Sequence, residues 1–399
     1  MEGFGHPALG LYISIPFCRS KCTYCNFSSG VYPTGEHARY VDRLIEDLRS
    51  AGSGVKKIGT DLQRLVDTIY LGGGTPSLLA PELLYRLFAA IRAVFFLDHN
   101  VEITMECAPG QLPDATLAAM ADCGVNRVSL GVQSFIDREA HESGRLHDRV
   151  AIETDLARLR GAGITNLNID LIAGLAGQTF ASWEDSLSAL IDSGSPHASI
   201  YMLEVDEDSR LGRELLAGGV RYHASLVPHE DAIARMYERA IERLAEAGIA
   251  QYEISNFARL GFESRHNLRY WQRKPYLGLG LDASSMLRAS TDVLRWTTTD
   301  DLRAYLEGAE TSEPERLSLD QQHEEAWFLG LRLNSGVDLA ALESEFGRSR
   351  IGAALETANQ LAADGLLDIS NGRVRLTEHG RLLSNDVFQE FLADAVESN

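Results

Sequence analysis

Three cysteines near the start of the chain have a spacing that could hold a metal cluster. Cys18, Cys22 and Cys25 form a Cys-x3-Cys-x2-Cys pattern directly after the apolar run 11–15. Three thiolates can hold three corners of a cubane iron-sulfur cluster. With no fourth cysteine close by, the fourth iron would stay open to a small chelating molecule. The pattern therefore predicts a cluster that acts on what it binds, rather than one that only carries electrons.

Zinc and disulfide bonds are the other common uses of cysteine. Structural zinc sites use four ligands, commonly as two separated Cys pairs, and the remaining Cys107 and Cys123 are distant and not paired in spacing. Five cysteines in a chain of 399 residues are not typical of a disulfide framework. We therefore interpret the first three cysteines as cluster ligands, and Cys107 and Cys123 as small core residues.

The composition narrows the class of protein and its compartment. The chain has 45% hydrophobic and 24% charged residues, as in ordinary globular proteins, and is long enough for two domains. Its net charge of -20 disfavours non-specific binding to nucleic acid or anionic membranes. The first residues lack the basic and apolar regions of a signal peptide, and no apolar stretch approaches the ~20 residues that span a bilayer. Oxygen-sensitive thiolates without an export signal predict a cytoplasmic protein.

Short apolar runs alternate with helical patterns in the first half of the chain, which is typical of repeated βα units and a parallel sheet. Six strands are predicted, at 11–15, 68–71, 101–105, 127–130, 167–172 and 198–203. The helices between them are predicted at 37–48, 81–94, 114–123, 150–162 and 183–191. Six such units indicate an α/β fold, an incomplete (β/α)6 barrel that is open on one side.

In such barrels the chemistry gathers at the C-terminal ends of the strands. The candidate residues follow the six strands in turn: the cysteines, the segment Gly72–Pro76, Glu106, Gln133, Asp170 and Glu204. A polar, irregular segment at 205–227 then precedes a predicted helix at 228–247, and we expect it to cross the barrel mouth. Six groups of candidate residues predicted at the same rim strengthen the prediction of a site there.

The character of the chain changes near residue 294, where we place a domain boundary that separates 1–293 from 294–399. Helical patterns at 320–333, 338–346 and 351–365 lead to alternating apolar residues around Asn371 and Gly372, a strong hairpin signal. Helices followed by a hairpin indicate a winged-helix-like C-terminal domain. Because the chain is acidic, a packing or lid role is favoured over DNA binding.

The cysteine pattern and its place after a first strand resemble the radical S-adenosylmethionine superfamily. Further segments are similar to the oxygen-independent coproporphyrinogen III oxidase family, namely 12–25, 72–77, 131–135, 168–175 and 252–258. The resemblance runs from about Leu11 into the C-terminal domain. It implies that the methionine part of S-adenosylmethionine chelates the open iron, and that an electron from the cluster cleaves the sulfonium.

Three features resemble the heme-chaperone branch of that family, the HemW type, more than its dehydrogenases. Phe27 stands where the dehydrogenases carry an additional cysteine, and the chain has a short segment before Cys18. The sequence His266-Asn267-Leu268-Arg269-Tyr270-Trp271 matches a His-Asn-x-x-Tyr-Trp signature that is implicated in heme binding in that branch. An imidazole can ligate heme iron while aromatic rings cover the porphyrin, although a structural histidine among core aromatics is the alternative.

One segment departs from the pattern of these relatives. Where they often carry a histidine, this chain has Ser284, and Asp282 adds a charge. We therefore expect cluster binding more firmly than heme binding near this loop.

The resemblance also implies which residues contact S-adenosylmethionine. Small residues let the backbone approach its methionine end closely, while carboxylates and an arginine fork suit its ribose, ammonium and carboxylate groups. The implied cofactor residues are Tyr12, Tyr24, Gly73, Gly74, Thr75, Glu106, Gln133, Arg145 and Asp170, with His266 for heme. Tyr12 and Glu204 carry the weakest support, since an inward tyrosine can be part of the core.

The predicted function is that of a heme chaperone, which binds a 4Fe-4S cluster, S-adenosylmethionine and heme and passes heme to an acceptor protein. The alternative is an oxygen-independent coproporphyrinogen III dehydrogenase. A radical enzyme that modifies nucleic acid shares the cluster pattern, but the acidic charge balance opposes it. The expected partners are the heme acceptor and an electron donor such as flavodoxin or ferredoxin, and they could include membrane heme proteins in transient contact.

Overall fold

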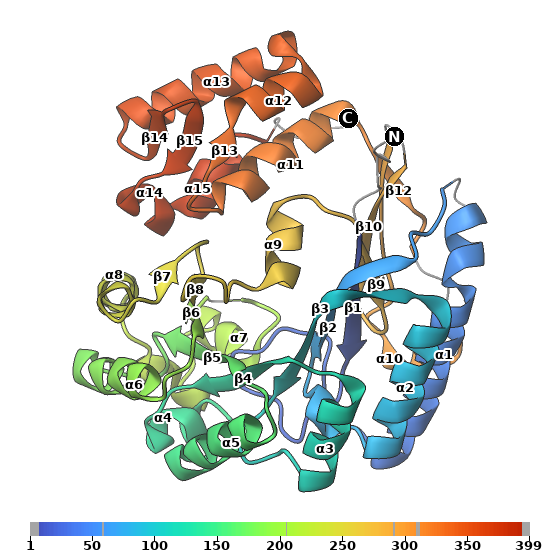
Figure 1. The fold of residues 1–399 in the computed structure, drawn as a ribbon. Helices are drawn as coiled ribbons and strands as arrows, with labels where there is room; N and C mark the ends of the chain where they lie inside the picture. Colours follow the sequence, from blue (N-terminus) through green and yellow to red (C-terminus); the bar gives the residue numbers. More distant parts are fainter. Residues whose placement is uncertain (1–7, 58–59, 205, 290–291, 309–311, 393–399) are drawn as a thin grey trace.

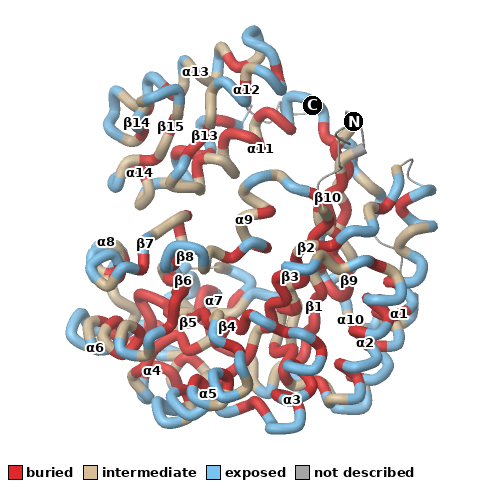
Figure 2. The backbone as a smooth tube through the Cα atoms, in the orientation of Figure 1, coloured by how far each residue is buried: buried red, intermediate tan, exposed pale blue. Residues whose placement is uncertain are grey.

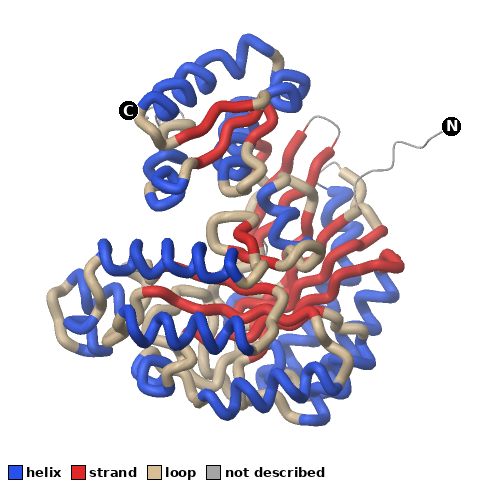
Figure 3. Tube along the Cα trace, turned by 60° about the vertical axis from the view of Figure 1, so that its left-hand side comes forward, coloured by secondary structure: helices blue, strands red, loops and turns tan. Residues whose placement is uncertain are grey.

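A computed structural model describes residues 8–57, 60–204, 206–289, 292–308 and 312–392. Its strands form one large sheet and one small sheet, and the small sheet belongs to a C-terminal unit that lies above the large one (Figure 1). Helices run along the outer side of the large sheet (Figure 3). The predicted α/β class with a C-terminal helical unit is confirmed.

The centre of the large sheet is built from the six predicted strands, each parallel to its neighbour. They are β1 (Leu9–Ile15), β2 (Leu65–Gly73), β3 (Phe96–Cys107), β4 (Arg127–Gln133), β5 (Asn166–Ala173) and β6 (His197–Met202). The helical segments between them are α1 (Thr34–Lys57), η1 (Pro76–Leu78), α2 (Pro81–Val94), α3 (Asp114–Cys123), α4 (Asp137–Glu142), α5 (Arg149–Gly161) and α6 (Phe180–Asp192). All six predicted strands therefore exist, in the predicted order.

The sheet continues beyond these strands at both edges. One edge carries β9 (Tyr276–Leu279), β10 (Ser284–Ala289), β11 (Asp292–Thr297) and β12 (Glu315–Leu317), and the other carries β8 (Asn256–Ala258) and β7 (Ala250–Gln251). Only β9 is parallel to its neighbour in the centre, β1. The strand order ends at β12 on one side and at β7 on the other, so the barrel is open, as predicted.

The segment after β6 contains more regular structure than expected. It holds α7 (Arg210–Leu216) and η2 (Arg221–Leu226) before the predicted long helix, which is α8 (Glu230–Glu246). Two further helices, α9 (Arg265–Trp271) and α10 (Leu302–Leu306), follow among the edge strands. Within the described ranges, no helix combines the length and the apolar character needed to cross a bilayer.

The C-terminal unit has a hydrophobic core of its own. Its elements are α11 (Leu319–Leu331), β13 (Val337–Asp338), α12 (Leu339–Phe346), α13 (Arg348–Ala363), β14 (Leu367–Ser370), β15 (Arg373–Leu376), α14 (Glu378–Leu382) and α15 (Ser384–Gln389). Asn371 and Gly372 form the hairpin turn with φ of 51° and 71°, as a two-residue turn of this kind requires. The boundary predicted after residue 293 falls inside β11, and we place the division after β12.

The two faces of the parallel sheet differ in chemistry. On β4, Val128 and Leu130 are fully buried in the core against the helices, while Ser129 between them faces a cavity. Buried residues form a continuous band beneath the helices (Figure 2). Parallel sheets are normally apolar on both faces, so a polar inner face marks the space where a ligand can lie.

Candidate functional site

A cavity of about 930 Å³ lies at the C-terminal ends of the parallel strands and extends to the C-terminal unit. Most of the residues predicted for the site line it: Cys18, Cys22, Tyr24, Cys25, Gly73, Gly74, Thr75, Glu106, Gln133, Arg145, Asp170 and Glu204. Tyr12 and His266 are not among the lining residues. Residues that follow six different strands therefore line one cavity, as expected for the C-terminal ends of barrel strands.

Backbone hydrogen bonds hold the cysteine loop against two neighbouring segments. Gly74 N–H donates to the Ile15 carbonyl at 2.9 Å, and Thr75 N–H donates to the Phe17 carbonyl at 2.8 Å. On the other side, Thr23 N–H donates to the Ser143 carbonyl at 3.0 Å. The loop is thus fixed between the glycine segment after β2 and the turn after α4.

Gly74 has no room for a side chain. A Cβ atom there would lie 2.8 Å from the carbonyl oxygens of Ile15 and Phe17. Because these are backbone atoms of the cysteine loop, they cannot move aside as a flexible side chain would. This close approach explains why a glycine stands at this position, where the alternative was a turn glycine.

We expect Gly74→Ala to lower the free energy of unfolding by about 1–3 kcal/mol, since the added methyl group forces two backbone segments apart. The matched control is Gly54→Ala, because Gly54 is exposed in α1 and a Cβ there meets nothing within 4 Å. Alanine at Gly54 should be neutral or stabilising by up to ~1 kcal/mol. Urea denaturation of both variants checks this, and equal stabilities would contradict the close packing of Gly74.

The three cysteines are not disulfide-bonded, and Arg145 lies beside them. Its guanidinium donates to Cys22 Sγ at 3.6 Å and to the Gly131 carbonyl. Within the described part of the chain, no three His, Cys, Asp or Glu side chains converge on a single metal ion. The three thiols and the adjacent cation suit an anionic cluster, in which each cysteine bonds a different iron.

Two carboxyl groups face the centre of the cavity. Glu106 accepts hydrogen bonds from Tyr70 Oη at 2.9 Å and from Gly73 N–H at 3.2 Å. Burial, and next the charge of Asp170, raise the pKa of Glu106 to about 7. Asp170 accepts from Ser129 Oγ at 3.1 Å and from Asn168 Nδ2 at 2.6 Å, and burial raises its pKa. Two carboxyl groups so close favour a ligand with cationic or hydroxyl groups.

Gln133 lies at an irregularity between β4 and β5. Its φ of 68° is in the left-handed region, and the strand register shifts between Gly131 and Gln133. Bulges of this kind turn a side chain away from its regular direction and occur beside functional sites. The buried Gln133 side chain therefore reaches the cavity instead of the core.

The two predicted tyrosines have different positions. Tyr24 lines the cavity, and burial, together with the charge of Cys22, raises its pKa. Tyr12 is not among the lining residues, and it stacks on Tyr70 with 6.2 Å between ring centroids. A ring at Tyr24 can stack on a planar ligand, whereas Tyr12 supports the residue that holds Glu106.

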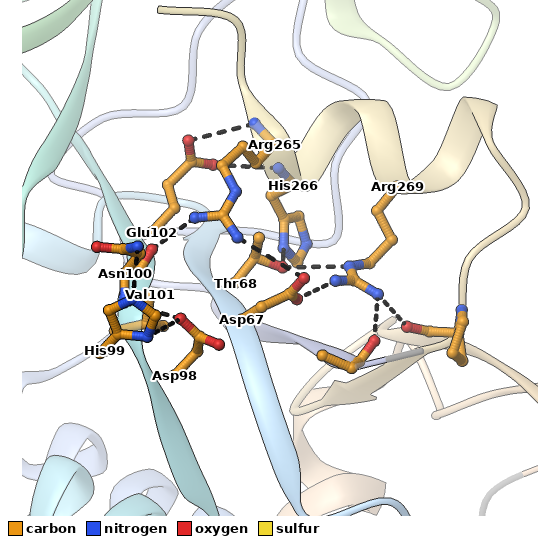
Figure 4. Close-up of polar contacts among 12 residues, drawn as sticks. Asp67, Thr68, Asp98, His99, Asn100, Val101, Glu102, Arg265, His266 and Arg269 are labelled. Carbon is orange, nitrogen blue, oxygen red and sulfur yellow. Dashed lines mark hydrogen bonds and ion pairs between the residues drawn. The ribbon is translucent and has the colours of Figure 1, made fainter. Parts of the chain in front are cut away.

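His266 is placed in the interior, away from the cavity lining, and this departs from its predicted role at heme iron. It is 1% exposed, and its Nδ1 atom is hydrogen-bonded to Thr68 Oγ1 at 2.9 Å (Figure 4). Its Nε2 atom is hydrogen-bonded to Tyr270 Oη at 2.8 Å. Burial lowers its pKa to about 3. With both nitrogens engaged, the ring has no free lone pair for a metal, so the geometry is that of the structural alternative.

The rest of the signature also ties elements together. Glu102 on β3 accepts hydrogen bonds from the N–H groups of Arg265 and His266 at the start of α9 (Figure 4). The buried Arg269 pairs with Asp67 and donates to the carbonyls of Ala8 and Pro275 at 2.8 Å. These contacts fix α9 to β2 and β3 and to the residue just before β1, in the central part of the sheet.

The unusual loop residues Asp282 and Ser284 lie near the cysteine loop and the sheet edge. Asp282 has a φ of 54° and accepts a hydrogen bond from Ser28 Oγ at 2.8 Å. Ser284 Oγ lies 2.9 Å from Thr297 Oγ1 on β11. Both residues therefore have local structural partners.

Sequence reasoning missed several residues that line the cavity. Tyr201, at the end of β6, follows the strand-end rule and could have been found. Arg332, Leu382 and Leu383 come from the C-terminal unit, and no pattern in the sequence indicated that this unit reaches the cavity.

Comparison with known proteins places these observations in a family. The radical SAM superfamily matches residues 12–190, and the HemN C-terminal domain matches residues 317–383. The heme chaperone HemW of Lactococcus lactis is 36% identical over 96% of this chain and 97% of its own length. The heme chaperone HemW of Bacillus subtilis is 33% identical over 96% and 99%.

A solved structure supports the same fold. The coproporphyrinogen III oxidase HemN from Escherichia coli, a radical SAM enzyme, aligns with a TM-score of 0.82 at 23% identity, over 97% of this chain and 90% of that one. This likeness covers both the open barrel and the C-terminal unit. The similarity to the two chaperones over nearly their full length shows that the chain belongs to the HemW family of the radical SAM superfamily.

Proposed function

We propose that this chain is a heme chaperone that binds a 4Fe-4S cluster, S-adenosylmethionine and heme, and that passes heme to an acceptor protein. The full-length similarity to proteins named heme chaperone HemW carries this proposal. The cavity with its three thiols and its polar walls supports it. The alternative of a coproporphyrinogen dehydrogenase is not favoured, because the likeness to HemN is a likeness of fold.

Cys18, Cys22 and Cys25 are the proposed cluster ligands. When bound, the cluster supplies one electron to the sulfonium of the cofactor. Arg145 beside Cys22 offsets part of the negative charge of the cluster. Gly74 and Thr75 hold the loop in place through their hydrogen bonds to Ile15 and Phe17.

The neighbouring residues suit S-adenosylmethionine. Gly73 has a φ of 98°, which leaves its backbone open to the methionine end of the ligand. Glu106 and Asp170 can accept hydrogen bonds from the ammonium and the ribose hydroxyls, and Arg145 can bind the carboxylate. Gln133 and Tyr24 complete the set on the cavity wall.

Glu106 makes this binding dependent on pH. Since its pKa is about 7, its carboxyl group is mostly neutral below pH 7 and mostly charged above it. A neutral carboxyl group attracts the ligand ammonium less, so the dissociation constant for S-adenosylmethionine should rise by up to about tenfold per pH unit below 7. Calorimetric titration from pH 6 to pH 8 measures this. Glu106→Gln should bind more weakly and flatten the profile, and an unchanged slope in that variant would rule Glu106 out.

The partners belong to the same proposal. The family name implies a heme-accepting protein, and the cluster implies an electron donor such as flavodoxin or ferredoxin, in a cytoplasmic setting. Transient contact with membrane heme proteins would suit a chaperone.

The deciding experiment is anaerobic. The reconstituted protein is mixed with heme and S-adenosylmethionine, and bound heme is measured, followed by its transfer to an apo heme protein. A parallel reaction offers coproporphyrinogen and follows its consumption. Stoichiometric heme that passes to the acceptor, without consumption of coproporphyrinogen, is expected. Turnover of coproporphyrinogen without heme binding would replace the chaperone with the enzyme.

A further inference from the structure

One part of the cavity, called the compartment below, lies next to the C-terminal unit. Its walls include Leu203 and Ile254 from the barrel side. The C-terminal unit adds Leu382 at the end of α14, Leu383 after it, and the polar residues Ser384, Asn385 and Asp386. A volume of about 930 Å³ lies near the top of the range of ~300–1,000 Å³ for small-molecule sites. The cavity can therefore hold a second ligand beside the cofactor, and that ligand would meet apolar side chains from both units.

Arg332, at the end of α11, projects into this compartment from the C-terminal unit. Its guanidinium carbon lies 4.2 Å from the ring centroid of Trp271, so the ring of α9 holds it in place. Its closest acidic contact, Nη2 to Glu253 Oε2, is 3.9 Å, longer than a hydrogen bond. Its Nε is buried without a hydrogen-bond partner. The side chain is thus held by stacking, with donors left unused.

Glu253 does not cancel this charge fully. It is completely buried, and its Oε1 accepts from Ser255 N–H at 3.2 Å and from Asn256 Nδ2, while Oε2 lacks a hydrogen bond. Burial raises the pKa of Glu253, while the charge of Arg332 lowers it. Arg332 therefore presents a positive charge that is only partly balanced.

Two other arginines in the cavity wall donate hydrogen bonds through their terminal nitrogens, although Arg145 Nε, like Arg332 Nε, is buried without a partner. Arg127 donates to Asn166 Oδ1 at 2.7 Å and to the Phe262 carbonyl at 3.2 Å. Arg145 donates to the Gly131 carbonyl and Cys22 Sγ and lies at the cysteine loop. Arg332 differs from both, since it is the arginine that the C-terminal unit contributes to the compartment.

We propose that the compartment under the C-terminal unit holds the porphyrin, and that Arg332 binds one of its propionate carboxylates. This inference rests on the proposed heme chaperone function and names the site and the group that is recognised. The planar fork of an arginine binds a carboxylate through two parallel hydrogen bonds. The leucine and isoleucine side chains of the two walls cover the apolar porphyrin faces.

The test compares heme with heme dimethyl ester, in which both propionates are masked. Wild-type protein should bind free heme about 10–100-fold more tightly than the ester, the effect of charge-assisted hydrogen bonds. Arg332→Met should bind the two ligands within about threefold of each other. Absorbance titration in the Soret region measures both dissociation constants for each protein.

The control is Arg273→Met. Arg273 also joins the barrel to the C-terminal unit, through Glu345 at 2.6 Å and over the ring of Phe346, but it does not line the cavity. It should keep the wild-type preference for free heme. A loss of preference in both variants would point to general loosening of the interface and overturn the proposal.

The remaining outcomes separate the propionate contact of Arg332 from the proposed heme chaperone function. If Arg332→Met keeps the full preference, the propionate contact is wrong while heme binding stands. If wild-type protein binds neither ligand, the chaperone function itself fails. Should the methionine variant not fold, Arg332→Lys decides the matter, because lysine keeps the charge without the fork. We expect at least a threefold smaller preference in that variant, and an unchanged preference would overturn the proposal.

Discussion

Replacing Cys22 by serine is expected to leave the reconstituted protein with almost no bound iron. Three thiolates are the full protein contribution to the proposed cluster, and serine at one of them removes a ligand that no neighbouring residue can replace. Cys22 is 8% exposed and lies within hydrogen-bonding distance of Arg145. Iron and acid-labile sulfide should fall from about four of each per chain to background, and the visible charge-transfer absorption should disappear with them.

Cys123→Ser is the matched control for this loss. Cys123 is also a buried, unbridged cysteine, but it ends α3 and does not line the cavity. Its serine variant should retain the full iron content after the same reconstitution. Cluster retention in Cys22→Ser, with loss in Cys123→Ser, would contradict the assignment of the ligands. The same measurement on Cys18→Ser and Cys25→Ser extends the test to the whole loop.

The barrel and its rim could be predicted because they rest on local patterns. Apolar runs such as 11–15 and 167–172 are long enough to mark strands, and the residues just after them fall on one rim. The positions of Glu106, Gln133 and Asp170 at strand ends therefore predicted that they line a single cavity, although they are far apart in the chain. The cysteine spacing needed no tertiary information at all.

Elements that depend on long-range contacts could not be predicted from the sequence. The edge strands β7 and β8 have two and three residues and join the sheet only through pairing with β6 and with each other. The predicted boundary at residue 293 falls inside β11 for the same reason, since β11 and β12 join the large sheet only through the pairing of β10 with β11 and of β11 with β12. Arg332 reaches the site only because α11 packs beside the segment at Glu253.

The side chains of the segment 266–271 make contacts on two sides. His266 and Arg269 point to the sheet, while Trp271 supports the guanidinium of Arg332. In this structure the segment links the barrel to the part of the C-terminal unit that lines the cavity. Within this segment, Trp271 is the residue that can affect heme binding, through its contact with Arg332.

His266→Ala is expected to lower the free energy of unfolding by about 2–4 kcal/mol at pH 7.5. The change leaves a cavity and removes the buried hydrogen-bond partner of both Thr68 and Tyr270. For the fraction of protein that stays folded, the affinity for heme should remain within about threefold of wild type, because the imidazole lies outside the cavity. A loss of heme binding in well-folded variant protein would instead restore the role at heme iron.

The pH dependence of the same variant separates the two roles further. Burial lowers the pKa of His266 to about 3 in the folded state, against about 6.5 when unfolded. Between these values the unfolded chain binds one more proton, so wild-type protein loses stability as the pH falls through this window. The alanine variant lacks this group, and the stability gap between the two proteins should shrink by about 2 kcal/mol from pH 7.5 to pH 5. Urea denaturation at both values measures the gap, and a constant gap would mean that the ring is accessible to protons in the folded state, as a heme ligand in an open site would be.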